Sequence, residues 1–240
     1  MAESILAKRL ATVANLTDED RAQLDHLCRH VGMVRAKEDI TSEGDRPEQV
    51  QLILRGWAAR YMLLPEGERQ IVAFLIPGDF ADLNVAVLDR MDHGIIALSA
   101  CQVAYIDGNE LDQVISENPR LTRALLWSTL VDEAVLRQWI VNVGRRNAYE
   151  RIAHILCEMH ARMKMVGLAE DDRLALPLTQ NDLADATGLT AVHVNRTLQR
   201  LRGEGLIEIG SGTLNVLKVS ELQRAGRFDA QYLHLKRRSE

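Results

Sequence analysis

The chain has 240 residues, of which 47% are hydrophobic and 26% are charged, and its formal net charge at pH 7 is −5. This composition is typical of a globular protein and excludes a disordered or collagen-like chain. The length favours two domains, and the negative net charge means that any binding of nucleic acid needs a local basic surface.

The sequence also argues against membrane and disulfide-bonded classes of protein. The longest unbroken apolar run is Ile71–Ile76, far short of the roughly 18 residues of a membrane-spanning helix. The three cysteines, Cys28, Cys101 and Cys157, are widely spaced and form no Cys-x-x-Cys motif. This spacing indicates neither a disulfide framework nor a cysteine zinc site. We expect a cytoplasmic protein with no membrane partner.

The first predicted element is a short helix. Thr17 is a suitable N-cap, and the acidic residues 18–20 favour the positive end of a helix. Leu24, Leu27 and Val31 follow at helical spacing, which predicts one buried stripe.

From Val31 to Asp107 the sequence predicts short strands. Runs of four to eight apolar or β-branched residues alternate with turn signals at residues 43–45, 56, 65–67 and 77–79. Gln49–Leu54 partly alternates, as a half-buried strand does, whereas Ile71–Ile76 is apolar throughout and predicts a strand covered on both faces. The pattern predicts an antiparallel sandwich or barrel with an aliphatic core.

Two helices are predicted next. Asn109 opens a short helix that ends near Asn118. Asn118 and Pro119 then start another helix, because Asn is a good N-cap and Pro is favoured at the first helical position. No Gly or further Pro follows before Gly144, so this helix is expected to extend over about 25 residues, or about 37 Å.

The long helix has too many apolar residues for one packed face. We expect one stripe to pack on the strand-rich domain and another to pair with the same helix of a second copy; a central helix in a monomer is the alternative. The predicted dimer residues are Leu121, Trp127, Leu130, Val131, Ala134, Ile140 and Val141. The Gly-Arg-Arg-Asn segment at 144–147 is the expected hinge before a second domain.

The second domain contains two short predicted helices joined by Gly188. Thr179 and Asp182 form a capping-box pattern that opens the first helix, and Thr190 caps the second, which extends over residues 191–202. The expected buried stripe of this second helix is Val194, Leu198 and Leu201. This arrangement predicts a helix-turn-helix.

A predicted hairpin follows the two helices. Leu206–Ile209 and Thr213–Val216 flank the turn residues 210–212. A helix-turn-helix with a two-stranded wing indicates DNA binding more specifically than either part alone.

The charge pattern of the second helix supports DNA binding. It carries Arg196, Arg200 and Arg202, with no acidic residue between Gly188 and Arg202, and this is the local positive charge that phosphate contact requires. A solvated basic helix face is the alternative interpretation. The candidate base-reading residues are Ala191, Val192, His193, Asn195 and Arg196, of which Arg196 suits guanine and Asn195 suits adenine. The candidate phosphate contacts are Thr179, Gln180, Thr190, Arg200 and Arg202.

Motifs over most of the chain resemble those of the cyclic-AMP-receptor/FNR (Crp/Fnr) family of bacterial transcription regulators. The matching segments are 43–45, 54–56, 67–70, 77–80, 178–184, 188–190 and 194–196. The resemblance implies an α+β fold with a cyclic-nucleotide-binding-like β-roll, a dimerisation helix and a Crp-type winged helix-turn-helix. It also implies a homodimer on palindromic double-stranded DNA that acts on RNA polymerase. The expected domains are 1–117 (sensor), 118–146 (dimerisation helix and hinge), 147–218 (DNA-binding) and 219–240 (helical tail).

The sequence departs from the family pattern at the effector site. Family members that bind cyclic AMP have a Gly-Glu pair and, about ten residues later, an Arg-Ser or Arg-Thr pair, which residues 81–84 and 92–95 lack. A phosphate there would meet Asp82, Asp89 and Asp92. The expected degenerate pocket consists of Asp82, Asn84, Arg90, His93 and Gly94. We therefore expect no response to cyclic AMP, and the effector stays unknown.

Two other family features are also modified. An FNR-like iron–sulfur cluster needs four cysteines, and this chain has three. Val192 stands where the family commonly has a glutamate that reads cytosine, whereas Arg196 matches the family's guanine-reading arginine. We expect no cofactor and an operator that differs from the usual family sequences.

Weaker signals lie in a helix predicted at Arg151–Met163. His154, Cys157, Glu158 and His160 cluster on it, and the spacing of four residues between His154 and Glu158 is a weak metal-site signal. The alternative is that Cys157 packs in the core while both histidines hydrogen-bond or face water. We expect no metal. A sensor module that binds an effector or a metal, with a helix-turn-helix for protein contacts, is the alternative function. An enzyme is not expected, because the chain has no recognisable catalytic motif.

Overall fold

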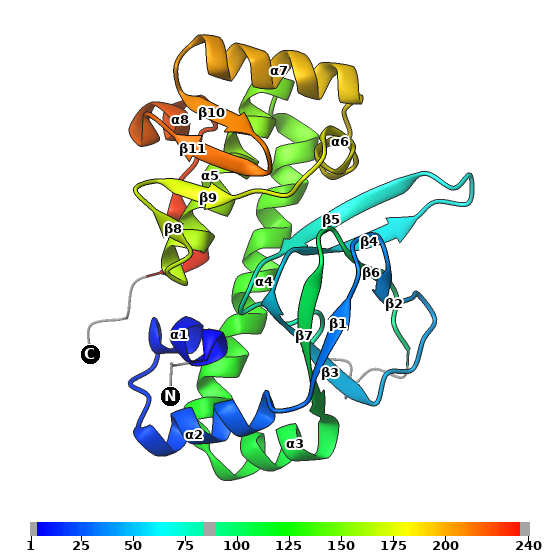
Figure 1. The fold of residues 1–240 in the computed structure, drawn as a ribbon, viewed down its shortest axis with the longest axis vertical. Helices are drawn as coiled ribbons and strands as arrows, with labels where there is room; N and C mark the ends of the chain where they lie inside the picture. The colour runs from blue at the N-terminus through cyan, green and yellow to red at the C-terminus, as the bar shows by residue number, and fades with distance from the viewer. Residues whose placement is uncertain (1–3, 84–89, 236–240) are drawn as a thin grey trace. The chain divides into compact units, whose positions relative to one another are not determined.

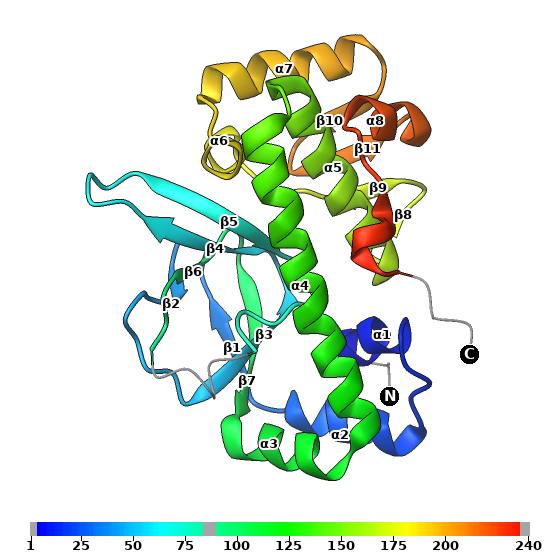
Figure 2. The ribbon, with the colours of Figure 1, turned by 180° about the vertical axis from the view of Figure 1, so that it is seen from behind.

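The computed structural model describes residues 4–83 and 90–235. The chain divides into two compact units. The first comprises the described residues up to Leu63 together with Ala73–Asp132, and the second comprises Leu64–Val72 and Glu133–His234. Helix α4 (Pro119–Arg145) contributes to both units and is one continuous helix in Figures 1 and 2. No helix of the described residues is long and apolar enough to span a membrane.

The N-terminal part of the chain is a β-roll, as expected, and three helices precede α4. The helices are α1 (Ile5–Ala11), α2 (Asp18–Leu27) and α3 (Gly108–Glu117). The strands are β1 (Val31–Val34), β2 (Asp39–Thr41), β3 (Gln49–Arg55), β4 (Ala58–Leu63), β5 (Arg69–Leu75), β6 (Gly94–Ala97) and β7 (Cys101–Asp107). They form two sheets, in the orders β1-β7-β3 and β2-β6-β4-β5. The antiparallel pairing of β1 and β3 with β7, and of β2 and β4 with β6, confirms the predicted β-rich domain.

A glycine is required where β3 turns into β4. Gly56 has a φ of 85°, and a Cβ atom built on it would lie 2.3 Å from the carbonyl oxygen of Ala100. No L side chain fits this approach. The turn signals at Gly44, Gly67 and Gly78 also correspond to positive φ angles.

The core of the first unit is mainly aliphatic and includes Leu24, Leu52 and Val103, which are fully buried. One ion pair is buried beside it. Arg9 of α1 pairs with Asp79, and each side chain is only 2% exposed. Asp79 also accepts a hydrogen bond from the backbone N–H of Ile76 at 2.7 Å. Since an unpaired buried charge is costly, this pair holds α1 against the residue 76–79 turn.

Two helix predictions need correction, and one helix was not predicted. Val31 does not extend the first predicted helix: α2 ends at Leu27, and Val31 pairs with Ala104 in the sheet. Asp107, not Asn109, caps α3, because its carboxylate accepts the N–H groups of the first turn. Helix α1 has no counterpart in the prediction, since its seven residues are too few for a clear period.

The break between α4 and the next helix falls within the predicted segment 144–147, although Gly144 itself is helical. A hinge role for this segment stays a prediction. Asn118 caps α4 as expected, since its Oδ1 accepts from the N–H of Leu121 at 3.2 Å. The helix then continues through Gly144 to Arg145. It stops because Asn147 and Glu150 form the capping box of the next helix, and this signal overrides the glycine.

The C-terminal part contains the remaining elements. They are α5 (Ala148–Met165), β8 (Ala169–Glu170), β9 (Arg173–Ala175), α6 (Gln180–Thr187), α7 (Ala191–Gly203), β10 (Ile207–Gly210), β11 (Thr213–Val216), α8 (Val219–Ala225) and a 3₁₀ turn η2 (Ala230–Leu233). The predicted hairpin is present as β10 and β11, and β9 and β8 extend it to a four-stranded sheet.

Candidate nucleic-acid interface

The predicted helix-turn-helix is present in the second unit. Gly188 joins α6 to α7 with a φ of 62°, a left-handed conformation that suits glycine. Thr179 and Asp182 form the predicted capping box of α6. The Thr190 hydroxyl accepts a hydrogen bond from the backbone N–H of His193 at 3.3 Å and so caps α7. These caps fix where each helix begins, and therefore which side chains α7 exposes.

One face of α7 is buried and the other is open to solvent. Val194, Leu198 and Leu201 form the buried stripe, as predicted. The candidate base-reading residues lie on the other side, half-buried at Ala191 and exposed at Val192, His193, Asn195 and Arg196. This face combines apolar, imidazole, amide and guanidinium groups, a set that can address base edges in a major groove.

Asn195 is held by the first residue of α6. Its Nδ2 donates a hydrogen bond to Oε1 of Gln180 at 3.2 Å, and both side chains are exposed. The sequence assigns Gln180 only to phosphate contact, because a separation of 15 residues carries no signal of this pair.

Arg200, a candidate phosphate contact, is engaged within the protein. Its Nε donates to Oε1 of Glu204 at 2.8 Å, and its guanidinium lies 4.2 Å from the centroid of the Tyr149 ring. The Tyr149 hydroxyl also donates to Glu204. Burial and this carboxylate raise the pKa of Tyr149 to about 12, and the hydrogen bonds from Tyr149 and Arg200 lower the pKa of Glu204. Glu204 therefore offsets one of the three positive charges of α7.

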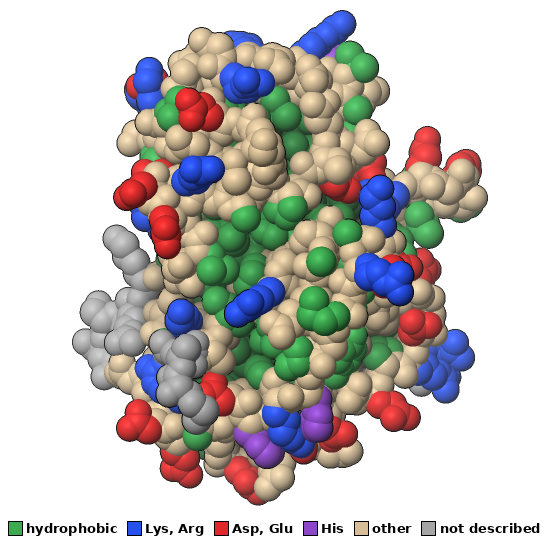
Figure 3. Space-filling view, viewed as in Figure 1, with side chains coloured by type: hydrophobic (Ala, Val, Ile, Leu, Met, Phe, Trp, Pro, Cys, Tyr) green, Lys and Arg blue, Asp and Glu red, His purple; other side chains and the backbone are tan. Residues whose placement is uncertain are grey.

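The surroundings of Arg196 and Arg202 differ from those of Arg200. Both are exposed, and neither has an ion-pair partner among residues 4–83 and 90–235. Basic and acidic side chains are interspersed on the face shown in Figure 3, with no division into a basic and an acidic half. Among the three arginines of α7, Arg196 and Arg202 therefore carry the charge that is available for DNA.

The two threonines among the candidate phosphate contacts use their hydroxyls to cap helices. Thr179 accepts from the N–H of Asp182 at 3.1 Å and donates to its carboxylate at 2.6 Å. Thr190 caps α7 in the same manner. A contact of either residue with phosphate stays a prediction.

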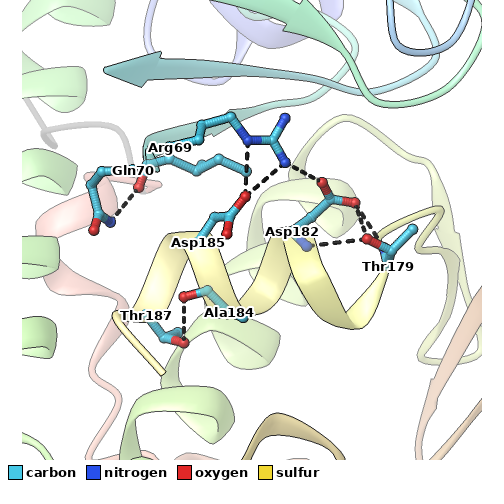
Figure 4. A network of polar contacts seen from close by, with 8 residues as sticks. Arg69, Gln70, Thr179, Asp182, Ala184, Asp185 and Thr187 are labelled. Carbon is cyan, nitrogen blue, oxygen red and sulfur yellow. Dashed lines mark hydrogen bonds and ion pairs between the residues drawn. The ribbon is translucent and has the colours of Figure 1, made fainter. Parts of the chain in front are cut away.

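An arginine outside the helix-turn-helix binds two carboxylates of α6 (Figure 4). Arg69 donates from Nε to Asp185 and from Nη2 to Asp182, each at 2.9 Å. Asp182 is also the capping partner of Thr179, so one carboxylate serves both interactions. Arg69 and α6 belong to the same unit. No sequence pattern indicates this contact, because 113 residues separate Arg69 from Asp182.

The predicted dimer residues divide into two groups. Leu130, Ile140 and Val141 are 51%, 73% and 44% exposed in the single chain and are available to a second copy. Leu121, Val131 and Ala134 are at most 5% exposed, so their assignment to a dimer contact is corrected: the chain itself covers them. Trp127 is half-buried.

Five exposed residues of α4, three apolar and two charged, follow a coiled-coil spacing. Leu126, Leu130, Glu133, Arg137 and Ile140 are separated by alternating steps of four and three residues, and we call them the α4 seam. Glu133 and Arg137 pair with each other at 3.4 Å. Steps of this kind place side chains along one line of a helix.

The expected effector pocket is only partly described. Asn84 lies outside the described residues. Asp82 is buried, and Arg90 is exposed and donates to the carbonyl of Gly44 at 3.4 Å. His93 bonds to Asp92 at 2.6 Å, and this hydrogen bond lowers the pKa of Asp92. Gly94 lies in β6, where a Cβ atom would fall 2.3 Å from the ring of Tyr61.

An arginine that the sequence analysis missed lies within the roll. Arg60 of β4 donates to the carbonyls of Ala81 at 2.7 Å and Phe80 at 3.0 Å, and to Asp132 of α4 at 2.9 Å. Its side chain is 13% exposed. Nε and Nη2 of this cation therefore bond to groups of the first unit.

The weak metal-site signal on α5 does not correspond to a convergent site. His154 contacts the carbonyl of Gly226 at 3.2 Å, whereas His160 bonds to Asp172 at 2.9 Å. The buried Glu158 carboxylate accepts from Trp139, Arg162 and Tyr232. Burial lowers the pKa of His154 to about 4. Among the described residues, no three His, Cys, Asp or Glu side chains are placed to hold a metal ion.

Comparison with known proteins covers nearly the whole chain. A cyclic nucleotide-binding domain model matches residues 33–118, and a Crp-like helix-turn-helix domain model matches residues 150–225. The nitrogen fixation regulation protein FixK of Bradyrhizobium diazoefficiens is 30% identical over 89% of this chain and 88% of its own. The transcriptional activatory protein AadR of Rhodopseudomonas palustris is 29% identical over 92% of this chain and 88% of its own.

A solved structure has the same architecture. FixK2 from Bradyrhizobium japonicum matches with a TM-score of 0.74 and 27% sequence identity, over 83% of this chain and 98% of that one. The similarity therefore extends from the β-roll to the helix-turn-helix.

Proposed function

The chain belongs to the Crp/Fnr family of transcription regulators, and from this premise we propose that it binds a palindromic operator as a homodimer. The two α7 helices would occupy successive major grooves, about 34 Å apart. The family consists of transcription regulators and not of enzymes. The proposed domains are the sensor at 1–117, the dimerisation helix at 118–146, the DNA-binding domain at 147–218 and the tail at 219–240.

The exposed face of α7 is the observation that carries this proposal. Arg196 is exposed and has no ion-pair partner among the described residues, so its guanidinium can grip O6 and N7 of a guanine. Val192 is 61% exposed and suits a thymine methyl. His193 and Asn195 complete the base-reading face, and Gln180 and Arg202 flank it as phosphate contacts.

The α4 seam supports the homodimer. Leu126 and Ile140 are 57% and 73% exposed, and exposed apolar residues at this spacing are typical of paired helices. Pairing two copies of the seam would bury these side chains and present α7 twice, as a palindromic operator requires.

We propose that cyclic nucleotides are not the effector. Arg60, a cation within the roll, donates hydrogen bonds to two carbonyls and to Asp132. Asp82 follows Ala81 directly in the sequence, and its side chain is buried. A carboxylate at this position would repel a phosphate. An iron–sulfur cluster is equally disfavoured, because the three cysteines are buried in separate elements and burial raises each thiol pKa to about 11 or 12.

DNA binding also implies a second protein partner and a location in the cell. A regulator bound at a promoter acts on RNA polymerase, which is the second proposed protein partner. Since bacterial DNA lies in the cytoplasm, we place the protein there.

A mobility-shift titration tests the function. Duplexes selected from random DNA should bind the protein at nanomolar concentrations, and the affinity should fall steeply with salt as counterions are released. Arg196→Ala should weaken specific binding by about 1–3 kcal/mol and relax the preference at one base position in each half-site.

Arg224→Ala, at the end of α8, serves as the matched control and should bind like the wild type. Unchanged operator affinity and base preference in Arg196→Ala would refute the assignment of α7 as the base-reading helix.

A further inference from the structure

Gln180 and Asn195 connect the two helices of the motif through their side chains. Nδ2 of Asn195 donates to Oε1 of Gln180 at 3.2 Å. Gln180 is the first residue of α6, and Asn195 lies on the exposed face of α7. The bond therefore orients an amide on the base-reading face from outside α7.

The hydrogen-bonding groups of Asn195 that Gln180 does not use are available to DNA. Its amide has two N–H donors and one carbonyl acceptor. One donor is used by Gln180, which leaves one donor and the acceptor. In this bond the Nδ2 end of the Asn195 amide faces Gln180.

Only one base matches this remaining pair in the major groove. Adenine presents an acceptor at N7 and a donor at N6, so it can bond to both groups at once. Guanine presents two acceptors, and cytosine and thymine each present a single hydrogen-bonding group there. The amide as held by Gln180 is thus complementary to adenine.

The helix that carries Gln180 is itself held in place. Thr179 and Asp182 cap its first turn, and Arg69 bonds to Asp182 and Asp185 (Figure 4). The backbone of Gln180 is therefore held in place. Because the Gln180 side chain accepts a hydrogen bond from Asn195, it limits the rotation of the Asn195 amide.

We infer that Gln180 is a positioning residue that fixes the Asn195 amide and sets a preference for adenine at the base that Asn195 reads. The inference rests on the proposed function. The two N–H groups of Gln180 Nε2 are not needed for this role and can donate to a backbone phosphate, so the same residue contributes to sequence preference and to overall affinity.

The test compares four operator duplexes that differ only at the base pair read by Asn195, which is the position where Asn195→Ala loses discrimination. The wild type should prefer adenine by about 5- to 150-fold. Gln180→Ala should lose most of this preference. Gln180→Glu keeps the acceptor oxygen and should retain the preference, although all four duplexes bind more weakly because a donor is lost and a negative charge is gained.

Asn181→Ala changes the neighbouring exposed residue of α6 and should leave the preference unchanged. In the double variant of Gln180 and Asn195, the loss of preference should not exceed that of Asn195→Ala alone. Circular dichroism and thermal unfolding establish that each variant is folded.

Two outcomes would overturn the inference. One is full adenine preference in Gln180→Ala, with or without an equal loss of affinity for all four duplexes, and the other is that no base position depends on Asn195. In each of these cases the wild type still binds its operator, so the proposed function survives. If the wild type binds no specific duplex, the proposed function itself fails.

Discussion

Arg200 and Arg202 lie two residues apart near the end of α7, yet their environments differ. Arg200 is held by Glu204 and Tyr149, whereas Arg202 is exposed without an ion-pair partner in the described part of the chain. We predict that Arg202→Ala weakens binding to all DNA sequences and lowers the salt slope by about 1. Arg200→Ala should change the slope less, because its charge is already compensated.

Dissociation constants measured over a series of salt concentrations, with the wild type and both variants, check this prediction. Each arginine is the control for the other, since both changes remove one charge from the same turn. Equal slopes for the two variants would contradict the distinction drawn from their contacts.

Asp20 supplies a pH-dependent contribution to the stability of the first unit. Although burial opposes it, hydrogen bonds from Asn118, Thr17 and Arg120 lower the pKa of Asp20 from 3.8 to about 2. Since the folded-state value is the lower one, the stabilisation is complete above pH 3.8 and is lost as the pH falls through about 2. Asp20→Asn should therefore unfold at a lower temperature than the wild type at neutral pH, and the difference should shrink towards pH 2.

Thermal unfolding by circular dichroism between pH 2 and 7 measures this difference. Asp112→Asn, on the exposed side of α3, is the matched carboxylate control. A difference between Asp20→Asn and the wild type that stays constant over the whole pH range would show that the carboxylate charge is not responsible.

The sequence identifies residues whose role follows from local spacing. Thr179, Thr190 and Gly188 occupy the predicted positions because caps and turns depend on neighbours three residues away or fewer. Gln180 and Arg60 act through partners that are distant in the chain. No periodicity or motif reports such pairs, so their roles needed the structure.

Helix α6 carries two carboxylates close to the proposed DNA surface, and Arg69 compensates them. Asp182 and Asp185 are 11% and 30% exposed, and each bonds to this guanidinium. We predict that Arg69→Ala weakens DNA binding by a similar factor for every sequence, because two negative charges then face the phosphates without compensation. The loss should diminish as salt increases and screens the repulsion.

Mobility-shift titrations at low and high salt measure this loss. Adding Asp185→Asn to Arg69→Ala removes one of the two uncompensated charges and should recover part of the affinity. If the double variant binds no better than Arg69→Ala, the effect is not electrostatic.

Prediction from sequence succeeds for the elements that carry a cap and a period. The helices α6 and α7 and the hairpin of β10 and β11 fall within a residue or two of the expected bounds. The two-residue strand β8 is too short for a period of two to be visible. Helix α4 extends two residues beyond its predicted end, because glycine is a weak stop and the next capping box begins at Asn147.

For the molecule as a whole, the proposed dimer depends on the α4 seam. Ile140 is 73% exposed in the single chain, so Ile140→Asp should leave the protomer folded. A charge on each copy in an apolar contact is costly, and we predict that the variant sediments as a monomer and loses most of its affinity for a palindromic operator.

Sedimentation velocity and circular dichroism test this prediction together. Leu168→Asp also replaces an exposed leucine, 39% accessible and outside α4, and should remain dimeric. A wild type that sediments as a monomer at all concentrations, or a dimeric Ile140→Asp variant, would place the dimer contact elsewhere or remove it.

The most direct measurement is hydroxyl-radical footprinting of the full chain on its selected operator, with the protein-to-duplex ratio determined in the same complex. We predict two protomers per duplex and two protected segments on the same side of the DNA, separated by about one helical turn. One protomer per duplex, or a single protected segment, would contradict the proposal that a symmetric pair of subunits presents α7 to two major grooves.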